Sequence, residues 1–185
     1  MLTRRSRRAF LIDSGRGVIA VSVLAANAMA SPGIVDAAEA QTSELTAAEA
    51  AALDALGDTL VPGAADAGIA RYVDDQLRSV TPLLMLRYLD FPMPLADFYH
   101  GTLAALDAVA RRNGGRTFAG LDASTRTSLV ATMATGTLDG WDGPPAPLVY
   151  FAIRADAVDV CYGTQAGFAR LRVPYAAHIA PSSDW

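Results

Sequence analysis

Apolar residues recur every three or four positions through most of the chain after residue 44, and proline or glycine separates one such stretch from the next. This spacing places apolar side chains on one face of an α-helix. No stretch shows the alternation of β-branched and polar residues that is typical of half-buried strands. The sequence therefore predicts an all-α fold, a single compact bundle of about five to six helices. The predicted helices cover residues 46–60, 69–77, 94–113, 122–135 and 148–162, and a further apolar stretch lies at 83–89.

Individual residues mark where these helices begin and end. Thr46 and Glu49 have the spacing of a capping box, and Asp122 is an N-cap residue before the helix at 122–135. Glycines 114 and 115 follow the longest predicted helix, where they favour its termination. These signals predict the helix boundaries independently of the apolar spacing.

Three side chains on the longer helices have an expected environment. Phe98 and Phe151 are expected to lie in the core, because each is an aromatic residue in a stretch with helical apolar spacing. His100 lies in the middle of the helix at 94–113. We expect it to be a half-buried, hydrogen-bonded histidine rather than a catalytic base.

The charged residues and the cysteine exclude several classes of function. The 185 residues include 15 basic residues, all arginine, against 19 acidic ones. Without lysine there is no Schiff-base lysine and no P-loop lysine for a nucleotide phosphate. The acidic balance argues against nucleic acid as a partner. The single cysteine, Cys161, excludes an internal disulfide and a four-thiolate iron–sulfur cluster.

The first 40 residues are expected to be an export signal rather than part of the fold. Four arginines in residues 1–8 precede an apolar run at 18–30, which ends in Ala28-Met29-Ala30, a small-x-small cleavage pattern. Ala38-Glu39-Ala40 fits nearly as well, so cleavage is expected after Ala30 or Ala40. The alternative is an uncleaved membrane anchor, but the run is shorter than the roughly 20 residues that a spanning helix needs. Residues 41–185 would then form the helical domain.

Within this signal, one motif indicates the export route. Ser6-Arg7-Arg8-Ala9-Phe10-Leu11 resembles the twin-arginine export motif and departs from it only at Ile12, where lysine is usual. The resemblance rests on Ser6, Arg7, Arg8, Phe10 and Leu11. It implies recognition by the twin-arginine translocase and transport to the periplasm of a protein that is already folded, usually with a cofactor inserted.

The chain offers no clear catalytic, cofactor-binding or metal-ligating residues. No serine lies in a G-x-S-x-G elbow, and His100 and His178 do not form an H-x-x-x-H pair of the kind that binds zinc. An export route for cofactor proteins is thus attached to a chain without a recognisable cofactor site. The simplest interpretation is that another subunit holds the cofactor and is exported together with this chain.

Residues 163–185 are expected to be an irregular, aromatic C-terminal tail. Aromatic residues in an irregular terminal segment pack against something, either the same chain or a partner, and the sequence leaves both open. Cys161 is either a buried, inert thiol or one half of an intersubunit disulfide. The candidate partner contacts are Cys161, Tyr162, Phe168, Tyr175, His178 and Trp185.

Several stretches resemble the gluconate 2-dehydrogenase subunit 3 family, the small subunits of periplasmic flavin-dependent dehydrogenases. They lie at residues 45–49, 53–63, 64–74, 118–121, 153–156 and 162–163. The resemblance implies a non-catalytic subunit beside a large flavoprotein of the glucose–methanol–choline oxidoreductase type, which holds FAD. Often a multihaem cytochrome c joins as a third subunit, carries haem c and passes electrons to the membrane. The tail departs from the family pattern at 164–168, which leaves the substrate of the dehydrogenase open.

Two other functions compete with this interpretation. A helical bundle with aromatic clusters can hold a ligand between its helices, so the chain could be an autonomous periplasmic ligand-binding protein. An independent secreted enzyme would need a nucleophile, metal cluster or phosphate-binding loop, for which the sequence offers no pattern. Flavin absorption and a second, larger polypeptide after purification from the native host would distinguish the subunit from both.

Overall fold

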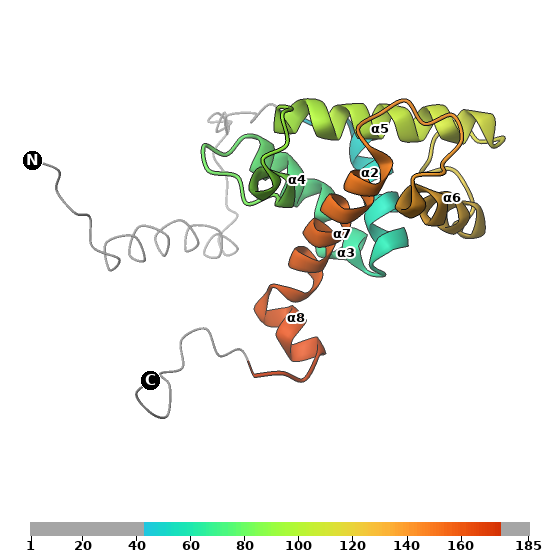
Figure 1. The fold of residues 1–185 in the computed structure, drawn as a ribbon. Coiled ribbons are helices and arrows are strands. Elements are labelled where there is room, and N and C mark those ends of the chain that lie inside the picture. The colour runs from blue at the N-terminus through green and yellow to red at the C-terminus, as the bar shows by residue number, and fades with distance from the viewer. Residues whose placement is uncertain (1–42, 175–185) are drawn as a thin grey trace, which may run out of the picture. The chain divides into compact units, whose positions relative to one another are not determined.

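The computed structural model describes residues 43–174, and every regular element in that range is a helix (Figure 1). This confirms the predicted all-α class. Five helices have nine residues or more, two are short, and one element is a 3₁₀ helix. The elements are α2 (Ala47–Leu60), α3 (Ala64–Ala67), α4 (Ile69–Leu77), η1 (Met85–Leu89), α5 (Leu95–Arg112), α6 (Ala123–Thr135), α7 (Ala146–Tyr162) and α8 (Gln165–Arg170).

Helix α7 is the element around which the others are arranged. It packs against α2, α3, α4, α6, α8 and η1, and Figure 1 shows it (orange) running from the level of α5 down to α8. The core contains fully buried side chains from most of the elements, including Leu53, Leu56, Ile69, Phe98, Leu106, Val149 and Ile153. The predicted core position of Phe98 is confirmed; its ring makes edge-on contacts with Phe91 and Tyr99.

The helix boundaries follow the predicted capping residues. Thr46 Oγ1 accepts a hydrogen bond from the Glu49 amide, and the Glu49 carboxylate accepts one from the Thr46 amide, which completes the capping box of α2. Asp122 caps α6, and hydrogen bonds from Ser124 and Thr125 hold the pKa of its carboxyl well below the ordinary value. Gly136 ends α6 in the left-handed region, at φ 72°.

The segment at 83–89 differs from the helical stretches around it, since it forms the 3₁₀ helix η1 after an extended Leu84. The Arg87 amide donates to the Leu84 carbonyl, three residues back, while the Met85 amide donates to the side chain of Asp156 on α7. A tertiary hydrogen bond thus begins this element, and no local sequence signal encodes it.

Part of the expected irregular tail is helical. Residues 165–170 form α8, which Thr164 caps by accepting a hydrogen bond from the Gly167 amide. Six residues are too few for apolar periodicity to reveal a helix. The predicted contact residues Tyr175, His178 and Trp185 lie outside the described residues, as does the whole predicted export signal. Among the helices within 43–174, none has the length and hydropathy to cross a membrane.

Helices α2 and α4 approach closely at Gly57. This glycine is buried in α2, and a Cβ atom placed on it would lie 2.9 Å from both Cδ1 and Cγ2 of Ile69 on α4. At Gly101 in α5 the nearest atom to such a Cβ is Pro144 Cδ, at 3.6 Å, an ordinary van der Waals distance. One helical glycine therefore has a packing role that the other does not.

We predict opposite effects of Gly57→Ala and Gly101→Ala on stability. Alanine gains up to about 1 kcal/mol of helix propensity at either site. At Gly57 the added methyl group must displace Ile69 in the core, and overpacking of this kind costs about 1–3 kcal/mol. Thermal unfolding of the mature chain, followed by circular dichroism, should show a lower Tm for Gly57→Ala and a higher Tm for Gly101→Ala. An equal rise for both variants would contradict the proposed role of Gly57.

Candidate interaction surface

A carboxylate lies fully buried in the middle of α7. Asp156 accepts a hydrogen bond from the Tyr99 hydroxyl of α5 at 2.5 Å and another from the Met85 amide of η1 at 2.9 Å. The side chain thus joins three elements that are distant in sequence. Its two bonds satisfy a buried hydroxyl and the first amide of η1, and either would be costly to leave unpaired.

Burial changes the acidity of this pair. It raises the pKa of Asp156 to about 6, although the hydrogen bonds from Tyr99 and Met85 act in the opposite direction. Burial and the nearby Asp156 together raise the pKa of Tyr99 well above its usual value. Tyr99 is therefore a hydrogen-bond donor at any physiological pH, and Asp156 is the acceptor.

Beside this pair, η1 exposes the basic Arg87 together with an aromatic and an apolar residue. Tyr88 is 63% exposed, and Leu89 next to it is also exposed. The half-buried Tyr72 of α4 lies near both Tyr88 and Asp159 of α7: burial, then Asp156, Asp159 and Tyr88, raise its pKa to about 12. Tyr88 therefore lies near α4, while η1 as a whole packs against α7.

Helix α7 has a second apolar side, which faces outward. At 100° per residue, Phe151, Ala155, Val158 and Tyr162 form a stripe about 60° wide along the helix. We call these four residues the outer stripe. Phe151 is 50% exposed and Val158 is 38% exposed, whereas Ala155 and Tyr162 are half-buried. The opposite side, which includes Val149, Ile153 and Ala157, is completely buried.

The expected core position of Phe151 is wrong. Both sides of α7 have apolar residues at helical spacing, so periodicity alone does not tell which side faces the core. The side that packs inward includes the small residues Ala152 and Ala157, which allow neighbouring helices to approach closely. The bulkier Phe151 remains on the outside.

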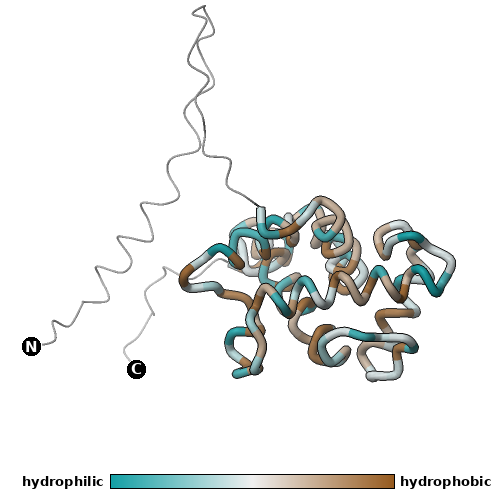
Figure 2. Tube along the Cα trace, turned by 90° about the horizontal axis from the view of Figure 1, so that it is seen from above, coloured by the Kyte–Doolittle hydropathy of each residue, from teal (hydrophilic) through white to brown (hydrophobic). Residues whose placement is uncertain are grey.

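Exposed apolar side chains are also found in two connecting segments. Val80, Leu83 and Met93 lie in the connection between α4 and α5, and Leu171 and Val173 follow α8. Figure 2 shows hydrophobic stretches at the periphery of the trace as well as within it. These residues are spread over separate segments, and single exposed apolar side chains are common on protein surfaces.

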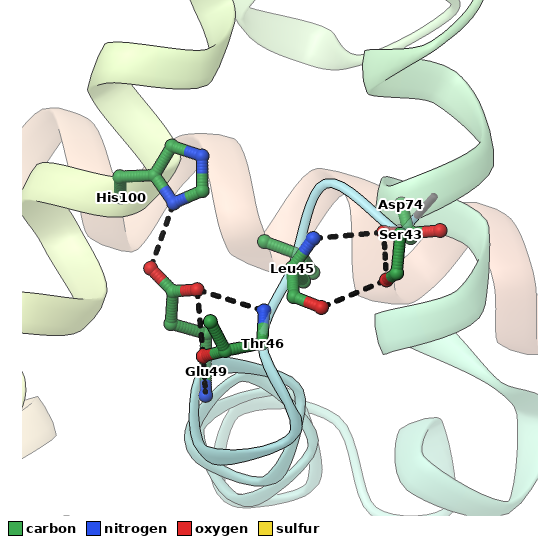
Figure 3. A network of polar contacts seen from close by, with 6 residues as sticks. All are labelled: Ser43, Leu45, Thr46, Glu49, Asp74 and His100. Carbon is green, nitrogen blue, oxygen red and sulfur yellow. Dashed lines mark hydrogen bonds and ion pairs between the residues drawn. The ribbon is translucent and has the colours of Figure 1, made fainter. Parts of the chain in front are cut away.

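A different polar network fixes the start of α2 (Figure 3). His100 Nδ1 lies 2.7 Å from Glu49 Oε1, while Asp74 accepts hydrogen bonds from the Ser43 hydroxyl and the Leu45 amide. Burial acts to raise the pKa of Glu49, but hydrogen bonds from Thr46 and His100 hold it below the ordinary value. The expected half-buried, hydrogen-bonded state of His100 is confirmed, and the contact ties α2 to α5.

The sequence of this chain matches the model of a known protein family. The model of the family described as gluconate 2-dehydrogenase subunit 3 matches residues 47–178. The chain belongs to this family. No curated protein and no solved structure gives a significant match. Membership of the family makes the chain a subunit of a multi-subunit dehydrogenase.

The structure describes three of the subunit's predicted contact residues. Cys161 is 2% exposed, and burial raises the pKa of its thiol. Tyr162, at the end of the outer stripe, and Phe168 in α8 are half-buried. Residues Ser6, Arg7, Arg8, Phe10 and Leu11 lie outside the described range. In the described part of the subunit, no three His, Cys, Asp or Glu side chains gather closely enough to hold a metal ion.

Sequence reasoning missed Asp156, Tyr99 and the exposure of the outer stripe. A single acidic residue between alanines in an apolar helix is the only local sign of Asp156, and its partners come from positions 57 and 71 residues away. The Asp156 pair and the outer stripe occupy opposite parts of the same helix. The hydrogen bonds of Asp156 fix η1 beside α7, whereas the outer stripe faces away from the core.

We predict that Asp156 lowers the stability of the subunit as the pH rises. Its pKa of about 6 in the folded chain exceeds the ordinary value of 3.8, so the folded state binds the proton more tightly than the unfolded state. The stabilising contribution is therefore complete below about pH 4 and is lost as the pH rises through 6. Relative to Asp156→Asn, wild type should lose free energy of unfolding between pH 4 and pH 7 in urea titrations.

The exposed Asp142, in the connection between α6 and α7, provides the control for this measurement. Asp142→Asn makes the same change at a carboxylate that is not among the groups acting on Asp156, so its free energy of unfolding should change with pH as that of wild type does. Parallel profiles for wild type and Asp156→Asn would show that Asp156 does not titrate in this range.

Proposed function

We propose that this chain is the non-catalytic small subunit of a periplasmic flavin-dependent dehydrogenase that oxidises sugars, sugar acids or alcohols. The observation that carries the proposal is the family match over residues 47–178, which includes every helix from α2 to α8. The exposed apolar residues of α7 and η1 support it, because a subunit needs a surface for its partner.

In this proposal the chemistry takes place on another chain. FAD and the catalytic base belong to a large flavoprotein of the glucose–methanol–choline oxidoreductase type, and haem c belongs to a cytochrome subunit where one is present. No residue of the small subunit is assigned to either cofactor. Its contribution is to stabilise the large subunit and to bring it across the membrane.

The export role rests on the motif at Ser6, Arg7, Arg8, Phe10 and Leu11. The twin-arginine translocase carries folded proteins, so a large subunit that has already bound FAD could cross together with the small subunit. The complex would then act in the periplasm, and a cytochrome partner would hold it at the membrane. The small subunit would thus act as an export chaperone for a partner without a signal of its own.

We predict that Arg7→Lys/Arg8→Lys traps both subunits in the cytoplasm. The twin-arginine receptor reads the two guanidinium groups, whose fork geometry lysine does not reproduce. Cell fractionation with immunoblots for both chains, together with dehydrogenase activity of the periplasmic fraction, measures the effect. Arg4→Lys/Arg5→Lys is the matched control, because it makes the same change in the same basic segment outside the motif.

Two results would contradict the proposal. Normal periplasmic activity in the Arg7→Lys/Arg8→Lys strain would show that export does not depend on the motif. Purification of the chain from its native host as a colourless, monodisperse protein without a larger polypeptide would favour the autonomous ligand-binding protein instead.

A further inference from the structure

We propose that the outer stripe of α7, together with Tyr88 of η1, is the face of this subunit that docks on the large flavoprotein subunit. This inference rests on the proposed function, which supplies the partner. It assigns to an interface a set of residues that neither the family match nor the sequence pattern distinguishes from core.

The first argument is that α7 is apolar on both sides. Its inner side is saturated with contacts, because Val149, Ile153 and Ala157 are completely buried. In the outer stripe, Phe151 is 50% exposed and Val158 is 38% exposed. An apolar side of a helix is typically buried, and in the described residues of this chain only the inner one of the two apolar sides of α7 is completely buried. We infer that the outer apolar side is covered by a second surface.

The second argument comes from the charges that border the stripe. Arg154 and Asp159 lie on opposite edges of it when α7 is drawn at 100° per residue, and both are exposed. An apolar centre with a charged rim is the usual anatomy of a protein interface. The partner surface should therefore be apolar in the middle, with an acidic group opposite Arg154 and a basic group opposite Asp159.

The third argument is that further exposed apolar or aromatic residues lie on, or directly after, elements that pack against α7. One of these elements is η1, which exposes Tyr88. The hydrogen bond from the Met85 amide to Asp156 fixes η1, and therefore Tyr88, relative to α7. Beyond Tyr162 the chain leads through α8 to the exposed Leu171 and Val173.

The large subunit is the occupant that these observations favour. The family describes this chain as one subunit of a dehydrogenase, and the matched region continues past α8 to residue 178. The segment that follows the stripe is therefore part of what the family shares. Two other occupants of the stripe are possible in principle: a second copy of this chain, and the chain's own residues 175–185. The experiment below distinguishes both from the large subunit.

The test uses the full-length chain with an affinity tag, co-expressed with the large subunit. Val158→Asp and Phe151→Asp place a charge in the stripe, whereas Val80→Asp makes the same change at a valine that is 98% exposed in the connection between α4 and α5. Truncation of an interfacial anchor commonly costs about 2 kcal/mol or more, which corresponds to roughly a 30-fold loss of affinity. We expect such a loss for the two stripe variants and wild-type retention for Val80→Asp, with unchanged helical circular dichroism.

A second variant protects the test against misfolding. Arg154→Glu changes an exposed rim charge, so it leaves the core intact. It should weaken retention of the large subunit several-fold at low salt and less at high salt, because screening weakens rim charges. Wild-type retention for Arg154→Glu, Phe151→Asp and Val158→Asp alike would overturn the docking face while leaving the proposed function in place.

The remaining outcomes identify what else covers the stripe. If the wild-type chain retains no large subunit, the proposed function itself fails. If the isolated chain is a dimer that Phe151→Asp converts to a monomer, with retention unchanged, a second copy occupies the stripe. A third outcome is that deletion of residues 175–185 lowers Tm as much as Phe151→Asp does, and that combining the two changes lowers Tm no further. In that case the chain's own C-terminal segment covers the outer stripe. The last two results overturn the inference.

Discussion

The two hydrogen bonds to the Asp156 carboxylate determine much of the arrangement around α7. A carboxylate without partners in this position would cost several kcal/mol, so the fold depends on Tyr99 and on the Met85 amide being in place. The same bonds explain why the connection between α4 and α5 has a defined structure at η1. An element too short to be stable alone is anchored to the central helix by the hydrogen bond to Asp156 and by the buried side chain of Leu86.

Helix α7 relates this buried network to the function of a subunit. Its inner side is built from small and medium-sized residues that pack closely against the other helices, and it includes Asp156. Its outer side has larger apolar groups whose exposure adds nothing to the stability of the isolated chain. The family relationship makes the chain a subunit of a dehydrogenase, and the docking face proposed above would place these apolar groups against another subunit.

The sequence predicted the helices well because local signals define them. The capping box at Thr46 and Glu49 and the N-cap at Asp122 mark helix starts in the structure as they do in the sequence. By contrast, η1 depends on a bond to Asp156 on a distant helix, which no local rule contains. Periodicity placed Phe98 correctly but not Phe151, because α7 is apolar on both sides. The contact roles of Tyr162, Phe168 and the tail residues remain predictions.

The close crossing of α2 and α4 has a consequence for how sequences of this kind can diverge. The side chain of Ile69 occupies the space that a side chain at position 57 would need, so the sizes of the two residues depend on each other. A larger residue at position 57 requires a smaller one at position 69, while a change at either position alone leaves a clash or a void. Substitutions at these two sites should therefore occur in pairs among related chains, even though the residues lie on different helices.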